Sequence, residues 1–138
     1  MTEPVSGIVL DTNIVLDLLV FKDPVTLPLR QALEAGQLRW LSTDAMREEL
    51  ARVLAYPQIA KRLAYYALEP QDVLAARDAW VLTVDVAPKA PVTCKDPDDQ
   101  RFIDLAVAYQ CPVLSKDHAV LCMAKRLLAL GASARAAM

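Results

Sequence analysis

Hydrophobic positions in this chain fall into two patterns: short continuous runs, and longer stretches with apolar residues three or four apart. The runs at 7–10, 38–42 and 112–115, and the alternating segment 81–86, have the pattern of strands. The stretches between them have the period of amphipathic helices. We expect these helices over 14–21, 29–33, 44–56, 59–68, 70–80, 97–109 and 119–130.

Strands that alternate with helices predict right-handed crossovers, which build a mostly parallel sheet. The fold class is therefore α/β, with a central sheet and helices on both faces. The 138 residues suit one domain with a core over about 8–130. Residues 87–96 form the long irregular connection. We expect the alanine-rich end, 132–138, to fray because it has little to pack against.

Composition narrows the class of protein. Hydrophobic residues make up 55% of the chain and charged residues 23%, a balance too apolar for a disordered chain. The longest apolar runs, 63–68 and 119–124, are far shorter than the roughly 18 residues of a membrane-spanning helix. The first residues have no basic segment ahead of an apolar stretch, so we expect a cytoplasmic protein without a secretory signal.

Cysteine spacing and net charge exclude two further classes. Cys94, Cys111 and Cys122, taken with the single His118, match no zinc-binding pattern, and we expect reduced thiols. The net charge of −2 lacks the basic surplus of a DNA-binding module. It does not argue against an enzyme that meets phosphates through bound metal ions.

Acidic residues follow the predicted strands. Asp11 comes directly after the first strand and Asp117 after the last, and the long connection delivers further acids at the start of a helix. In open α/β sheets, ligand-binding and catalytic residues tend to lie at the carboxyl ends of the strands. A fourth carboxylate comes from the helix after the second strand. There Glu49 lies beside the apolar stripe, whereas Glu48 points about 100° further away.

Each acid also has an ordinary structural explanation. Asp96 before Pro97 suits a helix N-cap, and Asp98 and Asp99 would favour the helix dipole. Four carboxylates in one cleft, however, would repel each other by roughly 4 kcal/mol for a pair about 4 Å apart. A hard divalent cation such as Mg²⁺ or Mn²⁺ is the simplest compensation, because both prefer oxygen ligands.

Taken together, these motifs resemble the PIN-domain family of metal-dependent ribonucleases, including the VapC-like toxins of bacterial toxin–antitoxin pairs. The matching segments are Val9-Leu10-Asp11-Thr12-Asn13, Thr43 with Glu49-Leu50, Asp96-Pro97-Asp98-Asp99 through Ala106, and Val113-Leu114-Ser115-Lys116-Asp117. The resemblance covers roughly residues 8–130. It implies a three-layer α/β fold in which a mostly parallel sheet lies between helices.

The resemblance also implies a set of site residues. It assigns the catalytic and metal-binding acids to Asp11, Glu49, Asp99 and Asp117, and supporting roles to Thr12, Asn13, Ser115 and Asp96. The resemblance favours Asp99 over Asp96, because Asp99 stands seven residues before Ala106 and this spacing resembles that of the family. Two positions depart from the common pattern: Lys116 stands where glycine is frequent, and Asp104 adds an acid about 140° round the helix from Asp99.

The function implied is a Mg²⁺- or Mn²⁺-dependent endoribonuclease with one or two ions, acting as the toxin of a type II toxin–antitoxin pair. Its partners would be RNA, a small antitoxin and a second copy of the chain. Arg47, Arg101 and Lys116 are candidates for phosphate contacts. An apolar patch for the antitoxin is expected from Leu63, Tyr65, Tyr66 and Leu68, unless these side chains belong to the core.

Three alternatives stay open at this point. A degenerate PIN-like domain would bind a partner without catalysis. A phosphatase of the haloacid-dehalogenase type also begins with a strand-end aspartate, but it needs a second aspartate where this chain has Asn13. A receiver-type signalling domain needs an acidic pair after the first strand and an aspartate in mid-chain, and neither is evident.

Overall fold

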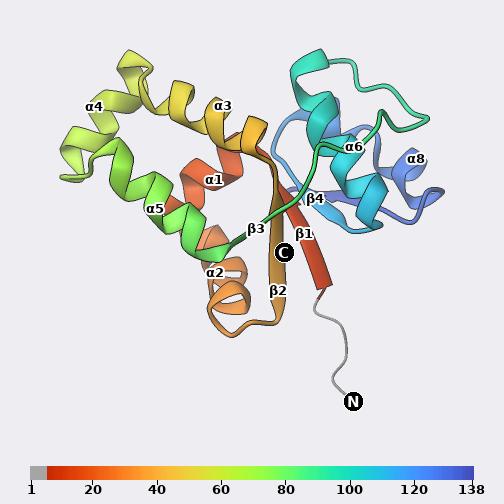
Figure 1. The fold of residues 1–138 in the computed structure, drawn as a ribbon, viewed down its shortest axis with the longest axis horizontal. Helices are drawn as coiled ribbons and strands as arrows, with labels where there is room; N and C mark the ends of the chain where they lie inside the picture. Colours follow the sequence, from red (N-terminus) through yellow and green to blue (C-terminus); the bar gives the residue numbers. More distant parts are fainter. Residues whose placement is uncertain (1–5) are drawn as a thin grey trace.

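A five-stranded parallel sheet runs through the middle of the molecule in the computed structural model, which describes residues 6–138 (Figure 1). The strands are β1 (Ser6–Leu10), β2 (Leu38–Ser42), β3 (Val81–Thr83), β4 (Pro112–Leu114) and β5 (Ser133–Arg135), in the order β3-β2-β1-β4-β5. All four neighbouring pairs are parallel. The α/β fold expected from the alternation of strands and helices is confirmed.

Helices cover both faces of this sheet, so the molecule has three layers. They are α1 (Thr12–Leu19), the 3₁₀ turn η1 (Pro24–Thr26), α2 (Leu27–Glu34), α3 (Asp44–Leu54), α4 (Pro57–Tyr65), α5 (Pro70–Trp80), the 3₁₀ turn η2 (Pro97–Asp99), α6 (Gln100–Tyr109), α7 (His118–Leu121) and α8 (Ala124–Leu128). Figure 1 shows α1 to α5 on one side of the strands and α6 and α8 on the other.

Each face of the sheet has its own apolar core, because successive side chains of a strand point to opposite faces. On β1, Ile8 and Leu10 pack among the side chains of α1 to α5, whereas Val9 packs with those of α6 to α8. On β4, Leu114 and Val113 divide in the same way. The continuous apolar runs of the sequence are therefore strands buried on both faces.

The chain after β3 crosses from one face of the sheet to the other and carries the acids with it. The strand expected over 81–86 ends at Thr83, and Val84 makes one further backbone bond to Ser42 at 2.9 Å before the chain leaves the sheet. The irregular connection then reaches η2 and α6 (Figure 1). The segment 97–109, expected as one helix, consists of the 3₁₀ turn η2 followed by α6.

Two expectations for the end of the chain are wrong. The helix predicted over 119–130 is two short helices, α7 and α8, with a break at Cys122 and Met123. The tail expected to fray instead contributes β5, which pairs with β4 in parallel. The open edge of β4 needs backbone partners, and a strand can supply them without large apolar side chains.

The helices within residues 6–138 are too short or too polar to span a bilayer. The first five residues, which bear on the expected lack of a secretory signal, lie outside the described part of the chain. The cysteines are free thiols; Cys94 and Cys111 are buried and Cys122 is exposed.

Candidate metal centre at the carboxyl ends of the strands

Acids from two separate segments lie together near the ends of β1 and β4. These strands are direct neighbours, with Leu10 opposite Leu114, so the residues that follow them are brought together. One carboxylate oxygen from each of Asp96, Asp99 and Asp117 lies within 4.8 Å of the other two. Asp96 and Asp99 come from the turn at the start of α6, and Asp117 from the loop after β4. Sequence reasoning gave Asp96 only a supporting role.

Asp11, at the end of β1, is buried, with only 3% of its surface exposed, and its charge interacts with those of Asp99 and Asp117. It is not in the group of three acids whose oxygens approach within 4.8 Å. Its Oδ1 accepts the backbone N–H of Ile14 at 3.1 Å, which caps α1, and its Oδ2 accepts the hydroxyl of Ser115. Burial raises the pKa of Asp11 and the charge of Asp117 adds to the rise, whereas the bonds from Ser115 and Ile14 oppose it. Asp11 therefore caps α1 and interacts electrostatically with the group of three acids.

Ser115 links the two strand ends. Its Oγ donates to Asp11 and accepts the backbone N–H of Asp117 at 3.0 Å. The Ser115 side chain is completely buried. One hydroxyl therefore fixes the position of Asp117 relative to Asp11.

Asp99 has the most perturbed environment of the cluster. Burial raises its pKa to about 7, with further increases from the hydrogen bond and charge of Asp117 and from the charges of Asp96 and Asp11. Its Oδ2 is buried and has no hydrogen-bond partner within residues 6–138. A buried oxygen without a partner is costly unless something binds it. This oxygen and the neighbouring carboxylates fit a hard divalent cation, whose preferred ligands are oxygens.

Glu49 is linked to the start of α1 through Thr12. As expected from the helical spacing, Glu49 is half-buried and Glu48 is exposed. Thr12, the residue after Asp11, donates its hydroxyl to Oε2 of Glu49 at 2.9 Å. Glu49 is not in the group of three acids whose oxygens approach within 4.8 Å. Asn13 is exposed, and its backbone N–H acts to lower the pKa of Asp11.

Two of the three basic residues expected to contact phosphates are paired with acids. Arg47 binds both oxygens of Asp78, with bonds of 2.9 to 3.2 Å. Lys116 places its Nζ 2.6 Å from Asp17, an acid of α1 that is 7% exposed. Arg101 is half-buried and lines a cavity of about 250 Å³ between the start of α3 and α6.

Arg77 supports the turn that precedes α3, and sequence reasoning missed it. It is 3% exposed and donates to the hydroxyl of Ser42, the carbonyl of Thr43 and the carboxylate of Asp78. A single arginine within a helical pattern gives no signal of such a role. Through these bonds Arg77 holds the end of β2 in place. Helix α3, which carries Glu49, begins directly after it.

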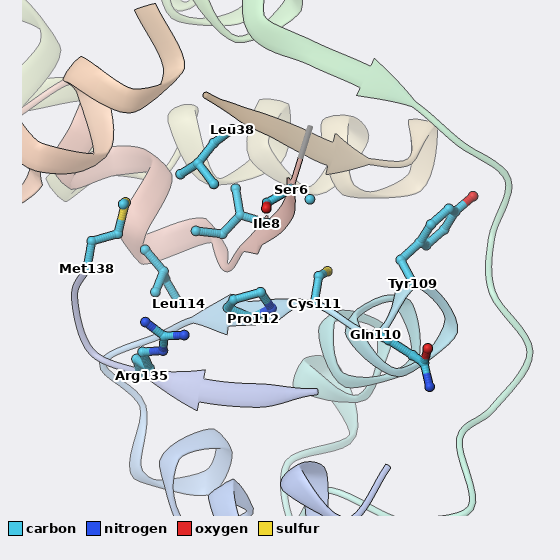
Figure 2. A pocket seen from close by; sticks show the side chains of 11 residues that line it. Ser6, Ile8, Leu38, Tyr109, Gln110, Cys111, Pro112, Leu114, Arg135 and Met138 are labelled. Carbon is cyan, nitrogen blue, oxygen red and sulfur yellow. The ribbon is translucent and has the colours of Figure 1, made fainter. Parts of the chain in front are cut away.

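A large cavity lies away from the acids, at the opposite ends of the strands. It has a volume of about 510 Å³ and begins at Ser6, Cys111 and Pro112, near the amino-terminal ends of β1 and β4. Figure 2 shows Leu38, Ile8 and Leu114 along one part of it and Tyr109 at the other end. None of the described residues that line it is acidic.

Comparison with known proteins identifies the family. A family model described as PIN domain matches residues 7–119, a range that contains Asp96 and the four acids predicted as ligands from the sequence. Searches of curated proteins and of solved structures give no significant match. PIN domains are generally nucleases and typically bind divalent metals. The parallel sheet and the acidic cluster at its carboxyl edge agree with the match. The chain therefore belongs to the PIN-domain family.

Proposed function

We propose that this protein is a Mg²⁺- or Mn²⁺-dependent endoribonuclease. The main support is Asp99: it lies against Asp96 and Asp117, its pKa is raised by burial and by these neighbours, and one of its oxygens lacks a partner within the described residues. A divalent cation would bind the oxygen that lacks a partner and would stabilise the charged form of Asp99.

The proposed ligands are Asp11, Glu49, Asp99 and Asp117, with Asp96 added because its carboxylate lies close to those of Asp99 and Asp117. One or two ions held there would activate water and neutralise the charge that develops on a phosphodiester during in-line attack. Asp11 contributes a buried carboxylate of fixed orientation, since Ser115 and the start of α1 hold both of its oxygens. Thr12 holds Glu49 toward the same edge of the sheet.

The products expected from the resemblance carry a 5′-phosphate and a 3′-hydroxyl. Asn13 is proposed to orient a ligand or the attacking water. Arg101 is proposed to contact a flanking phosphate. Arg47 and Lys116 would have to leave Asp78 and Asp17, respectively, to do the same.

A role as the cytoplasmic toxin of a type II toxin–antitoxin pair is also proposed, with a small antitoxin and a second copy of the chain as partners. Within the patch expected for the antitoxin, Leu63 is 2% exposed and belongs to the core, which agrees with the alternative interpretation that these side chains are core residues. Tyr65 is 82% exposed and Tyr66 39%, and their rings meet edge to face at 5.1 Å. These two rings at the end of α4 are the part of the patch that can bind a partner.

The test is RNA cleavage by the purified full-length chain at fixed Mg²⁺, on structured and single-stranded substrates. We expect the wild type to cleave RNA and the rate of Asp11→Asn to fall by more than about 100-fold. Loss of a residue that only orients a metal ligand typically costs up to about 100-fold, and loss of a ligand should cost more. Glu49→Gln should lose activity, whereas the neighbouring Glu48→Gln, an exposed position, should not. Equal rates for wild type and Asp11→Asn would refute the proposal.

The same assay separates the alternatives. Turnover of phosphomonoesters without RNA cleavage would favour a phosphatase. Failure to bind Mn²⁺ in calorimetry at neutral pH would favour a degenerate binding domain.

A further inference from the structure

We propose that Gln100 and Asp104 are positioning residues, which clamp the connection before the acidic turn so that Asp96 stays beside Asp99 and Asp117. The inference rests on the proposed function, because it concerns the geometry of the same metal site. It assigns a task to Asp104, the additional acid that departs from the pattern of the family.

The connection between β3 and η2 has no helix or strand, so its backbone groups need other partners. Side chains of α6 provide them for the segment 90–94. The backbone N–H of Ala90 donates to Oδ1 of Asp104 at 2.8 Å. The backbone N–H of Cys94 donates to Oε1 of Gln100 at 2.6 Å, and Nε2 of Gln100 donates to the carbonyl of Val92 at 3.1 Å.

Gln100 and Asp104 also bind each other. Nε2 of Gln100 donates to the same Oδ1 of Asp104 at 2.7 Å. Residues four apart on a helix lie on the same face, so α6 presents both side chains to the connection at once. Three backbone groups of 90–94 are thereby joined to one helix in a single network.

Packing supports the same contact. Ala90 is 5% exposed and Cys94 is 4% exposed, and both belong to the core that includes Phe102 and Ile103 of α6. Oδ1 of Asp104 thus accepts hydrogen bonds from Ala90 and Gln100. Asp104 is not among the three acids whose oxygens lie within 4.8 Å of one another.

The clamp acts where the acids repel each other. Asp96 follows Cys94 by two residues, and its carboxylate lies close to those of Asp99 and Asp117. Without an ion, repulsion favours an outward movement of Asp96, since Asp96 is partly exposed and sits on an irregular segment. Bonds to Cys94 and Val92 oppose this movement. A site held in place before the ion arrives binds the ion more tightly.

The test measures two quantities on the full-length chain: the Mn²⁺ concentration for half-maximal RNA cleavage, and the Kd for Mn²⁺ by calorimetry. We expect Gln100→Ala and Asp104→Ala to raise both by about 10- to 100-fold, the range for partners that orient metal ligands. KM for RNA should stay within about twofold, and kcat should recover at saturating Mn²⁺. The double variant should show less than the product of the single effects, because both belong to one network.

Controls separate positioning from stability. Asp104→Asn keeps an oxygen for the N–H of Ala90 and should show a smaller shift than Asp104→Ala. Asp72→Ala removes a cap at the start of α5, where Asp72 accepts the N–H of Glu69 at 2.8 Å, and should lower stability without changing the Mn²⁺ requirement. Gln100→Met keeps the length of the side chain and replaces Gln100→Ala if that variant does not fold.

A Mn²⁺ requirement within twofold of wild type in both the Gln100 and Asp104 variants overturns the clamp, provided that the wild type binds Mn²⁺ and cleaves RNA. A wild type that does neither overturns the proposed function, and the clamp with it. A shift of equal size in Asp72→Ala also overturns the clamp, because general destabilisation would then explain the result.

Discussion

Several acids of this protein serve two purposes at once. Asp11, Asp96 and Asp117 each cap a helix or a 3₁₀ turn, with bonds to the backbone N–H of Ile14, Asp98 and Ala119. The same carboxylates belong to the acidic cluster or lie against it. Capping and metal binding are compatible. In Asp96 and Asp117, Oδ1 accepts the N–H, which leaves Oδ2 for the site. Both oxygens of Asp11 accept a hydrogen bond, but each carboxylate oxygen can accept more than one partner.

The raised pKa of Asp99 predicts how pH affects the metal-free protein. An aspartate in an unfolded chain has a pKa of about 3.9, whereas Asp99 in the folded protein has a pKa of about 7. Between these values the folded state binds more protons, so stability should fall as pH rises from about 4 to 7. Thermal melts in a chelator at several pH values measure this slope.

Asp99→Asn should remove much of that slope. At pH 8 we expect its Tm without metal to exceed that of the wild type by about 3 °C, or about 1 kcal/mol, since water screens part of the repulsion at this half-buried position. The variant should also lose Mn²⁺ binding. A lower Tm than wild type at pH 8 would contradict the proposed repulsion.

Ser115→Ala tests the link between Asp11 and Asp117. The substitution leaves an oxygen of buried Asp11 without its hydroxyl donor, which should cost about 1–3 kcal/mol. Urea denaturation measures the loss. Ser133→Ala on β5 is the control: its hydroxyl is not buried, and the change should stay within about 0.5 kcal/mol. Equal costs for the two variants would show that the Ser115 bond is unimportant.

At the scale of elements, the sequence predicts best where one local rule decides the structure. The run 38–42 is a strand and 70–80 is a helix, as predicted. The helix expected over 119–130 fails for an instructive reason. Val120, Met123 and Leu127 are all fully buried and keep helical spacing, yet Val120 lies on α7, Leu127 on α8 and Met123 in the break between them. Two helices that follow one another can present the same apolar pattern as one.

Some contacts between distant elements could not be predicted from local patterns. Helical geometry placed Glu49 toward the apolar side of α3, and its bond to Thr12 agrees. The ion pair of Lys116 with Asp17 depends on how the loop after β4 meets α1, which no local pattern encodes. The sequence weighed capping by Asp96 against a place in the site, whereas in the structure Asp96 caps η2 and also lies close to Asp99 and Asp117.

Thr43 tests how far the start of α3 supports the site. Its hydroxyl accepts the N–H of Met46 at 3.2 Å and caps the helix that carries Glu49. Thr43→Val keeps the shape and removes the cap, which should cost about 1 kcal/mol in urea denaturation. Thr43→Ser keeps the cap at the loss of one methyl group. If Thr43→Ser were the less stable of the two, packing and not capping would determine the contribution of Thr43.

At the scale of the whole molecule, the end of the chain completes the sheet beside the site. β5 covers the edge of β4, and the N–H of Ser115 donates to the carbonyl of Arg135 at 2.9 Å. The residue that links Asp11 to Asp117 therefore depends on the last strand. Compositional reasoning overlooked this strand because its pairing uses backbone groups, and small side chains suffice for it.

Removal of residues 133–138 should lower both stability and metal affinity. The truncated chain loses the parallel partner of β4 and exposes the core around Ala132. We expect its Tm to fall by more than about 5 °C, because a loss of more than 1 kcal/mol shifts a domain of this size by several degrees. Mn²⁺ binding should weaken as well.

Arg135→Ala in the full-length chain is the control for this truncation, because it keeps the backbone bonds of β5. A truncated protein that melts within about 2 °C of the full-length chain would show that β5 contributes little to stability.

The central claim is that carboxylates from separate segments hold a divalent cation at the carboxyl ends of β1 and β4. Anomalous diffraction from a crystal soaked in Mn²⁺ tests this claim most directly. The account predicts an anomalous peak in contact with Asp99 and Asp117, within reach of Asp11 and Asp96, at metal–oxygen distances of roughly 2.0–2.3 Å. Density that shows these carboxylates without Mn²⁺, or Mn²⁺ bound only elsewhere on the molecule, would contradict it.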